Sequence, residues 1–422
     1  MKKKIIPIEM LYYASDLTLD LVERVVVQDE MQIIKSFLKN LTEYFDYIIQ
    51  SAEAGKPVVG HHFAFPGDLL RCFDITPICF EGLPYIFSAL FPSGSEPYYD
   101  SMNAFGHPYH TCTSQKGTLG MIIDGLFEFD AIVTPSAPCD NGVGSYQLFE
   151  YLGVPLVVAD MPYLHNDRGY TYFANELRRV VEEVGGIIGQ EPDYSKFKKA
   201  VEYSSRAHEF LIEINEMRKL KPCPVESMSN PLITAANAFM SGSPQFANFF
   251  KETYEIIKKR VKNHESRNGI ENYRVMFPYM SIFYDIGFYE WLDREIGVSL
   301  IVDIFNYFWF NPIQDNLDLD TIFLELAKTR MEAPMVRQSE SFVEVMIDDY
   351  VKMAKEFDVD CAILTEHIGC KQLAAASQII REELRENLGI PMLSIDLDVG
   401  DKRFTSIEVV KHEITEFTKT LL

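Results

Sequence analysis

Three of the seven cysteines stand where thiolate ligands are expected. Cys139 and Cys370 each follow a short apolar run and precede a helical pattern, and Cys112 precedes a third helical stretch. Ligands of open α/β sheets bind at the carboxyl ends of strands, where the following helices direct their N-termini. We expect the positive helix end to lower the pKa of these thiols and to favour the thiolate, which is the form that binds metal.

The residues alone leave the kind of metal site open. Three thiolates suit an iron–sulfur cubane with one open iron, or a zinc site completed by His110 or His367. No two cysteines form a CxxC pair, so zinc-ribbon and ferredoxin patterns are absent. The other cysteines are expected to be buried and not to bind metal: Cys72 within a helix over residues 68–73, Cys79 and Cys361 in strands, and Cys223 between prolines.

Two sheets are needed to position these cysteines. Short apolar runs alternate with helical patterns, which predicts βαβ units and parallel sheets. We expect strands within residues 58–65, 75–80, 131–135, 154–162, 273–280, 298–305, 361–365 and 390–397. The predicted domains are a helical N-terminal segment (1–55), a first α/β domain (56–193), a helical connector (194–268) and a second α/β domain (269–422).

The two α/β halves also resemble each other locally. Residues 130–139 (DAIVTPSAPC) match 360–370 (DCAILTEHIGC), and residues 152–160 (LGVPLVVAD) match 388–396 (LGIPMLSID). The first pair is an apolar strand that runs into a cysteine, and the second is a strand that ends in an aspartate. We therefore predict two Rossmann-like, doubly wound domains related by duplication, with the three cysteines converging in the cleft between them.

Residues that could handle protons or shape the site are less well defined. His61 and His62 end the first predicted strand, where one could face the cleft as an acid or base. Gly142 and Gly144 would let the backbone approach a cofactor at Cys139 closely. A solvated, internally paired loop is expected from the charged residues after the last strand, which are Asp396, Asp398, Asp401 and Arg403.

Composition excludes several classes of function. The chain has 62 acidic and 39 basic residues, and its formal charge of -23 repels nucleic acid and anionic membranes. Its apolar stretches are shorter than the roughly 20 residues that span a bilayer, and we find no secretory signal. Seven cysteines, an odd number, in a long chain without an export signal indicate free thiols or metal ligands in a reducing cytoplasm and not a disulfide framework. P-loop, dinucleotide-fingerprint and HExxH motifs are absent. We expect a cytoplasmic protein that binds neither nucleic acid nor a membrane.

The chain resembles the subunits of 2-hydroxyacyl-CoA dehydratases and benzoyl-CoA reductases, of the D-component type. The resemblance runs from about Pro57 to the C-terminus. It is carried, in order, by residues 65–74 (FPGDLLRCFD), the Cys112 loop, and residues 138–140 (PCD), 369–371 (GCK) and 396–405 (DLDVGDKRFT). This resemblance implies that Cys112, Cys139 and Cys370 hold a 4Fe-4S cluster with one open iron site.

The resemblance also implies a reaction and partners. One electron from a separate ATP-hydrolysing iron–sulfur activator protein would convert an (R)-2-hydroxyacyl-CoA into a ketyl radical that loses water, in a complex with a second homologous subunit. The candidates for proton handling are then His62 and Asp68. Three alternatives are open: a benzoyl-CoA reductase-type subunit that reduces an acyl-CoA, an electron-relaying subunit whose partner holds the substrate, and a two-domain binding protein without enzymatic activity.

Overall fold

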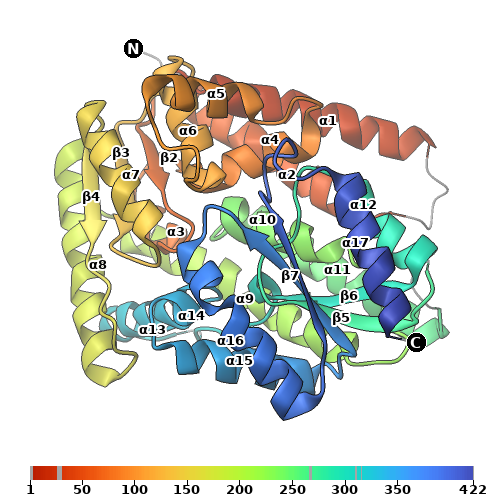
Figure 1. Cartoon of the computed structure of the whole chain (residues 1–422). Helices are drawn as coiled ribbons and strands as arrows, with labels where there is room; N and C mark the ends of the chain where they lie inside the picture. The colour runs from red at the N-terminus through yellow and green to blue at the C-terminus, as the bar shows by residue number, and fades with distance from the viewer. Residues whose placement is uncertain (1–2, 26–30, 266–268, 309–310, 315, 422) are drawn as a thin grey trace.

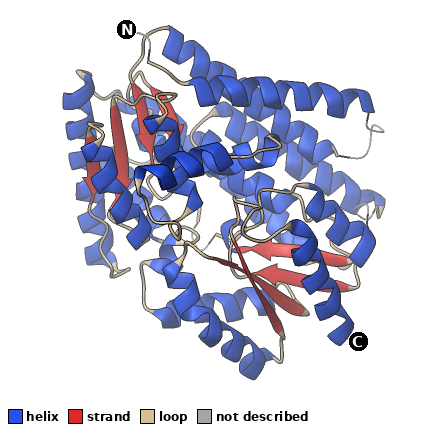
Figure 2. Cartoon of the chain, turned by 45° about the horizontal axis from the view of Figure 1, so that its top comes forward, coloured by secondary structure: helices blue, strands red, loops and turns tan. Residues whose placement is uncertain are grey.

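Two four-stranded parallel sheets form the framework of the protein (Figure 1). The computed structural model describes residues 3–25, 31–265, 269–308, 311–314 and 316–421. Figure 2 shows the two groups of strands well separated, with helices packed around each of them. The chain is therefore an α/β protein with two Rossmann-like domains, as the sequence predicts.

The first sheet has the strand order β2-β1-β3-β4. Its strands are β1 (Val58–His61), β2 (Thr76–Cys79), β3 (Ala131–Pro135) and β4 (Leu156–Ala159). All residues of β1, β2 and β3 are buried, because helices cover both faces of a parallel sheet. This burial explains why these strands read as continuous apolar runs in the sequence.

The second sheet repeats this arrangement. Its strands are β5 (Tyr273–Phe277), β6 (Val298–Asp303), β7 (Cys361–His367) and β8 (Met392–Leu397), in the order β6-β5-β7-β8. Numbered within each set, the two orders are the same, so the third strand lies between the first and the fourth in both sheets. Cys139 follows the third strand of one sheet and Cys370 follows the third strand of the other. This common order agrees with the predicted duplication.

Two sets of helices join the sheets. The N-terminal helices are α1 (Ile6–Val25) and α2 (Gln32–Glu53), and the connector contains α9 (Tyr194–Arg218), α10 (Ser229–Met240) and α11 (Pro244–Asn263). Helix α11 packs against both α9 and α2. At the α2 contact, the rings of Phe37 and Phe249 meet edge to face with centroids 5.6 Å apart. None of the described helices is long and apolar enough to cross a membrane.

The remaining helices flank the sheets. In the first half they are α3 (Gly67–Leu70), α4 (Leu83–Leu90), α5 (Glu96–Phe105), α6 (Thr113–Ile123), α7 (Asp140–Tyr151) and α8 (Asp167–Ile188). In the second half they are α12 (Gly287–Trp291), α13 (Leu319–Met331), α14 (Val336–Ser339), α15 (Val343–Glu356), α16 (Lys371–Leu388) and α17 (Ile407–Thr420). The described residues also form two 3-10 helices, η1 (Phe80–Gly82) and η3 (Ile304–Asn306), and one π-helix, η2 (Leu292–Ile296).

One predicted helix is shorter than expected. The prediction that Cys72 lies in a helix over residues 68–73 is wrong, because α3 ends at Leu70 and Cys72 lies in the turn that follows. The carbonyl of Cys72 accepts a hydrogen bond from the backbone N–H of Asp193 at 2.7 Å. Because this carbonyl is bonded to the segment before α9, it does not form a hydrogen bond within a helix.

Helix α13 brings the second half of the chain against the first. It packs on α8, where the guanidinium carbon of Arg178 lies 4.2 Å from the ring centroid of Phe323. Buried residues of α13 belong to the same apolar cluster as residues of β1, β3 and α8. A cavity lies between the two halves and is lined by side chains from both of them.

Candidate functional site

Each of the three predicted ligand cysteines is the N-cap residue of a helix. Cys112 precedes α6, Cys139 precedes α7 and Cys370 precedes α16, all three with extended backbone. The Cys139 Sγ atom accepts a hydrogen bond from the N–H of Gly142 at 3.4 Å. The sequence prediction that these cysteines lie at helix N-termini is thus confirmed.

The loops that carry the three cysteines meet, although they are far apart in the chain. A Cβ atom added to Gly369 would lie only 2.6 Å from the Cα atom of Cys112. Gln372, in the first turn after Cys370, donates a hydrogen bond to the carbonyl of Pro138 at 3.4 Å. The thiols are also close enough to interact electrostatically, because the charge of Cys139 raises the pKa of Cys112 and the charge of Cys370 raises the pKa of Cys139. We call Cys112, Cys139 and Cys370 the thiol cluster.

The expected lowering of the thiol pKa values is wrong. Burial raises the pKa of Cys112 and Cys370, and raises that of Cys139 to about 12. Backbone N–H groups of the following helices act in the expected direction, but more weakly than burial does. The sequence indicates the helix N-termini but not the depth at which the thiols are buried, and burial is the larger effect.

The arrangement of the donor atoms bears on the kind of metal group that they could hold. Within the described residues, no group of three His, Cys, Asp or Glu side chains is placed to hold one metal ion. His110 is exposed, while His367 is fully buried near the thiols. A cubane makes a different demand, because each thiolate binds a different iron atom and its ligands need not converge on one point.

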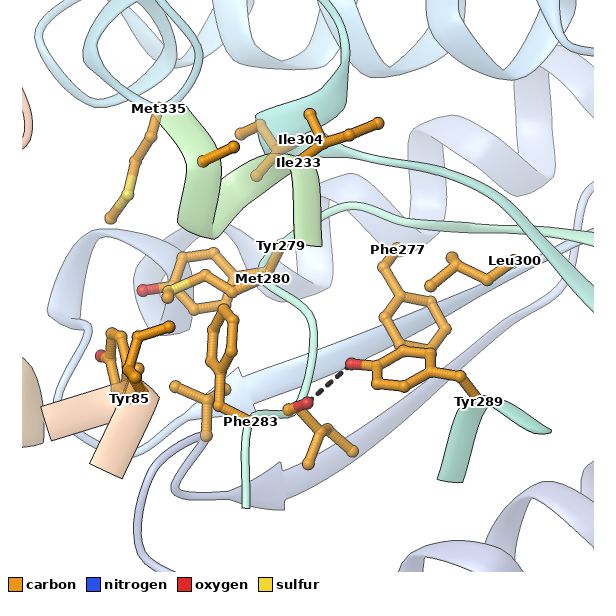
Figure 3. Close-up of a cluster of buried hydrophobic side chains, with 14 of the residues drawn as sticks. Tyr85, Ile233, Phe277, Tyr279, Met280, Phe283, Tyr289, Leu300, Ile304 and Met335 are labelled. Atoms are coloured by element: carbon orange, nitrogen blue, oxygen red, sulfur yellow. Dashed lines mark hydrogen bonds between the residues drawn. The ribbon is translucent and has the colours of Figure 1, made fainter. Parts of the chain in front are cut away.

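Two tyrosines support the thiol cluster. The hydroxyl of Tyr85 lies 3.7 Å from the Sγ atom of Cys112, and the hydroxyl of Tyr279 is hydrogen-bonded to Cys370. Figure 3 shows both rings in one buried cluster, with their hydroxyl oxygens directed to the same side. The ring of Tyr85 is stacked on Phe283 with centroids 4.9 Å apart. Neither tyrosine is singled out by the sequence, in which 22 tyrosines carry no local mark of this role.

A cavity of about 140 Å³ adjoins the thiol cluster, and both Cys112 and Cys139 line it. Its walls come from the loops of both sheets, the connector and α13 with α14. Most of the wall is apolar, including Phe63, Met280, Phe305, Leu326, Met335 and Val336. Apolar cavities with a few polar groups are typical of small-molecule sites. The cavity therefore offers an apolar small-molecule site beside the thiols.

Glu81 is a buried acid on the cavity wall that the sequence analysis missed. It is 4% exposed and lies in η1. Its Oε1 atom accepts a hydrogen bond from Gln115 at 2.7 Å, and its Oε2 atom accepts one from the N–H of Phe63 at 3.2 Å. Its charge is among the influences that raise the pKa of Cys139. The signal that points to Glu81 is a single acid inside an otherwise apolar run, because an acid buried there needs partners.

His62 lies behind Glu81 and not on the wall of the cavity. The ring is fully buried, its Nδ1 atom accepts a hydrogen bond from Ala64 N–H at 3.0 Å, and its Nε2 atom lies 3.0 Å from Oε2 of Glu81. The neighbouring His61 is also buried, and burial lowers its pKa to about 4. His62 thus stays a predicted proton-handling residue, but it does not line the cavity and contacts Glu81, which does.

Asp68 lines the cavity at a second polar position. Its Oδ1 atom accepts hydrogen bonds from the hydroxyls of Ser204 at 2.7 Å and Ser241 at 3.0 Å. Its Oδ2 atom lies 3.8 Å from a guanidinium nitrogen of Arg330, which comes from α13 and also lines the cavity. Burial lowers the pKa of Arg330. These contacts favour Asp68 as a fixed counterion of Arg330 over a role in moving protons.

The charged residues at and after the end of β8 match their prediction in part. Arg403 bonds to Asp401, and Asp396 and Arg403 are exposed as predicted, but Asp398 and Asp401 are buried. Asp398 accepts hydrogen bonds from the hydroxyl of Thr113 at 2.8 Å and from the N–H of Gly400 at 2.9 Å. The loop thus contacts the N-terminus of α6, directly after Cys112.

Comparison with known proteins identifies the family of the chain. A family model described as 2-hydroxyglutaryl-CoA dehydratase, D-component, matches residues 63–421. The chain belongs to this family. A similar protein is the lactoyl-CoA dehydratase subunit alpha of Anaerotignum propionicum, which is 23% identical over 286 residues, or 66% of this chain and 65% of that relative. The alignment thus spans just under two thirds of the relative's length. The chain is accordingly a component of the 2-hydroxyacyl-CoA dehydratase family, and the resemblance seen in its motifs is confirmed.

Proposed function

We propose that the chain is the iron–sulfur subunit of a 2-hydroxyacyl-CoA dehydratase, with Cys112, Cys139 and Cys370 as ligands of a 4Fe-4S cluster that has one open iron site. The observation that carries this proposal is the convergence of three helix-capping cysteines beside an apolar cavity. Family membership and a relative named lactoyl-CoA dehydratase support the reaction class. The substrate is then an (R)-2-hydroxyacyl-CoA.

The thiol cluster is suited to such a group. Small residues and N–H groups surround the sulfurs, and Gly142 points its N–H at Cys139. Bound iron brings positive charge, which favours thiolates where burial alone favours thiols. The chemistry that the cluster supplies when bound is transfer of one electron, which converts the thioester into a ketyl radical able to lose its 2-hydroxyl group as water.

The residues of the chain have separate tasks in this proposal. The apolar wall holds the acyl group and excludes water, so that a radical is not quenched by solvent. Glu81 holds or passes the proton that accompanies loss of the hydroxyl group, because it is the carboxylate held in place on the wall by Gln115. His62 lies on the far side of Glu81 and can exchange that proton with it.

Two partners belong to the proposal. One is a second homologous subunit, as the designation of the relative as a subunit suggests. The other is a separate ATP-hydrolysing iron–sulfur activator, which would deliver the electron because the sequence contains no P-loop. An acyl-CoA is the small-molecule partner.

Anaerobic purification tests the proposal. The native chain is expected to be brown with about four iron atoms, and Cys112→Ala, Cys139→Ala and Cys370→Ala to lose most of that iron. Cys361→Ala is the matched control, because Cys361 is a buried cysteine at the start of β7, and it should keep its iron. A colourless native chain, or full iron content in all three ligand variants, contradicts the proposal.

A turnover measurement separates the two reactions of the family. With the partner subunit and activator present, a dehydratase needs reductant only in trace amounts, because the electron returns after each cycle. Consumption of reductant in proportion to substrate indicates instead a reductase of the benzoyl-CoA type.

A further inference from the structure

His367 is a buried residue that the proposed function does not use. It ends β7, three positions before Cys370, and its side chain is 0% exposed. Among the described residues, neither of its ring nitrogens has a hydrogen-bond partner. Buried polar atoms nearly always have such a partner, so two bare nitrogens on one ring point to a group that lies beside it when the site is complete.

The ring lies between the segments that carry two of the three cysteines. A Cβ atom added to Gly369 would lie 3.0 Å from Nε2 of His367 and 2.8 Å from the backbone nitrogen of Cys112. One face of the ring is stacked on Tyr279, with an interplanar angle of 16°. Tyr279 in turn bonds to Cys370 and lines the cavity. The Nε2 edge of His367 is therefore next to the thiol cluster.

The other edge of the ring faces Asp398. Oδ2 of Asp398 lies 3.8 Å from Nδ1 of His367, which is too long for a hydrogen bond. Oδ1 of Asp398 is already held by Thr113 and Gly400. Asp398 is thus held in place and accepts no hydrogen bond from the His367 ring in this geometry. The Nε2 atom is therefore the ring nitrogen that can donate a hydrogen bond toward the thiol cluster.

We infer that the Nε2–H group of His367 donates a hydrogen bond to a sulfur atom of the cluster that the three cysteines hold, and so raises its reduction potential. This inference rests on the proposed function. A donor aimed at a cluster sulfur stabilises the negative charge that reduction adds, and hydrogen bonds to the sulfurs are one of the factors that set cluster potentials. His367 is then a positioning residue whose effect is seen in a potential.

Redox titration of three anaerobically prepared variants, followed by electron paramagnetic resonance, tests the inference. His367→Leu removes the donor, and at a fixed ambient potential we expect its ratio of reduced to oxidised cluster to fall at least tenfold, which is about 59 mV for one electron. His367→Gln can place an amide N–H near the Nε2 position and is expected to stay within about threefold of the native ratio. His367→Asn reaches only the Nδ1 position and is expected to behave like the Leu variant.

The possible outcomes distinguish failure of the proposed function from failure of the inference about His367. A native chain without iron overturns the proposed function together with the inference. A native chain with four iron atoms whose potential is unchanged in His367→Leu overturns only the inference, and so does a potential that Asn preserves and Gln does not. Where the Leu variant fails to take up iron, the comparison of Gln with Asn decides. Thermal unfolding of the iron-free variants checks that each one keeps its fold.

Discussion

Acid sensitivity of the fold is predicted from His208, a histidine of α9 that lines the cavity. Burial lowers its pKa from 6.5 to about 4, and its ring packs 4.9 Å from the ring of Phe308, measured between centroids. A base whose pKa is lower in the folded chain binds more protons when the chain unfolds. The stability that His208 contributes is therefore complete above pH 6.5 and is lost as the pH falls toward 4.

The magnitude follows from the two pKa values. A difference of about 2.5 units at 1.36 kcal/mol per unit corresponds to about 3 kcal/mol in full, of which about 2 kcal/mol is already lost at pH 5. His208→Gln removes this linkage. We expect the free energy of unfolding of the variant to fall by about 2 kcal/mol less than that of the native chain between pH 7.5 and pH 5.

Urea unfolding at several pH values measures this difference. The comparison is between slopes with pH, so a constant loss of stability from the substitution itself cancels. His412→Gln, at an exposed position of α17, is the matched control and should leave the slope as it is in the native chain. Equal pH slopes for the native chain and His208→Gln would refute the reasoning from burial.

Three further predictions concern the site. A Cβ atom at Gly369 would lie 2.6 Å from the Cα atom of the N-cap cysteine of α6, so Gly369→Ala is expected to lose iron. Gly144→Ala is the control, because a Cβ atom there has nothing within 4 Å, and it should keep its iron. Iron analysis of the two variants measures the difference. Glu81→Gln keeps the shape of the side chain but not its charge, and should lower kcat about 10²- to 10⁴-fold at unchanged iron content. Asp68→Asn leaves the largely buried guanidinium of Arg330 without its carboxylate, and urea unfolding should show a loss of about 3 kcal/mol.

Local patterns in the chain predict the strands and the placement of the three cysteines at helix N-termini. Apolar runs of five to nine residues predict each of the eight described strands. Strands such as β1, β2 and β3, which are covered on both faces, need no polar alternation. The step from such a run to a helical pattern places Cys139 and Cys370 at helix N-termini, since both signals are contained in about ten consecutive residues. The matched segments of the two halves predict a duplication, and the common strand order of the two sheets agrees with it.

Long-range packing determined the chemistry of the site. Burial raises the pKa of the thiols, whereas the helix N-termini act to lower it. How many chain segments cover a sulfur atom cannot be predicted from the residues next to it in sequence. Glu81 meets His62 and Gln115, and Asp68 meets Arg330, only because loops, connector and α13 close around one cavity. Burial and charge depend on everything within a few ångströms in space, whereas a pattern in the chain reports only what is near in sequence.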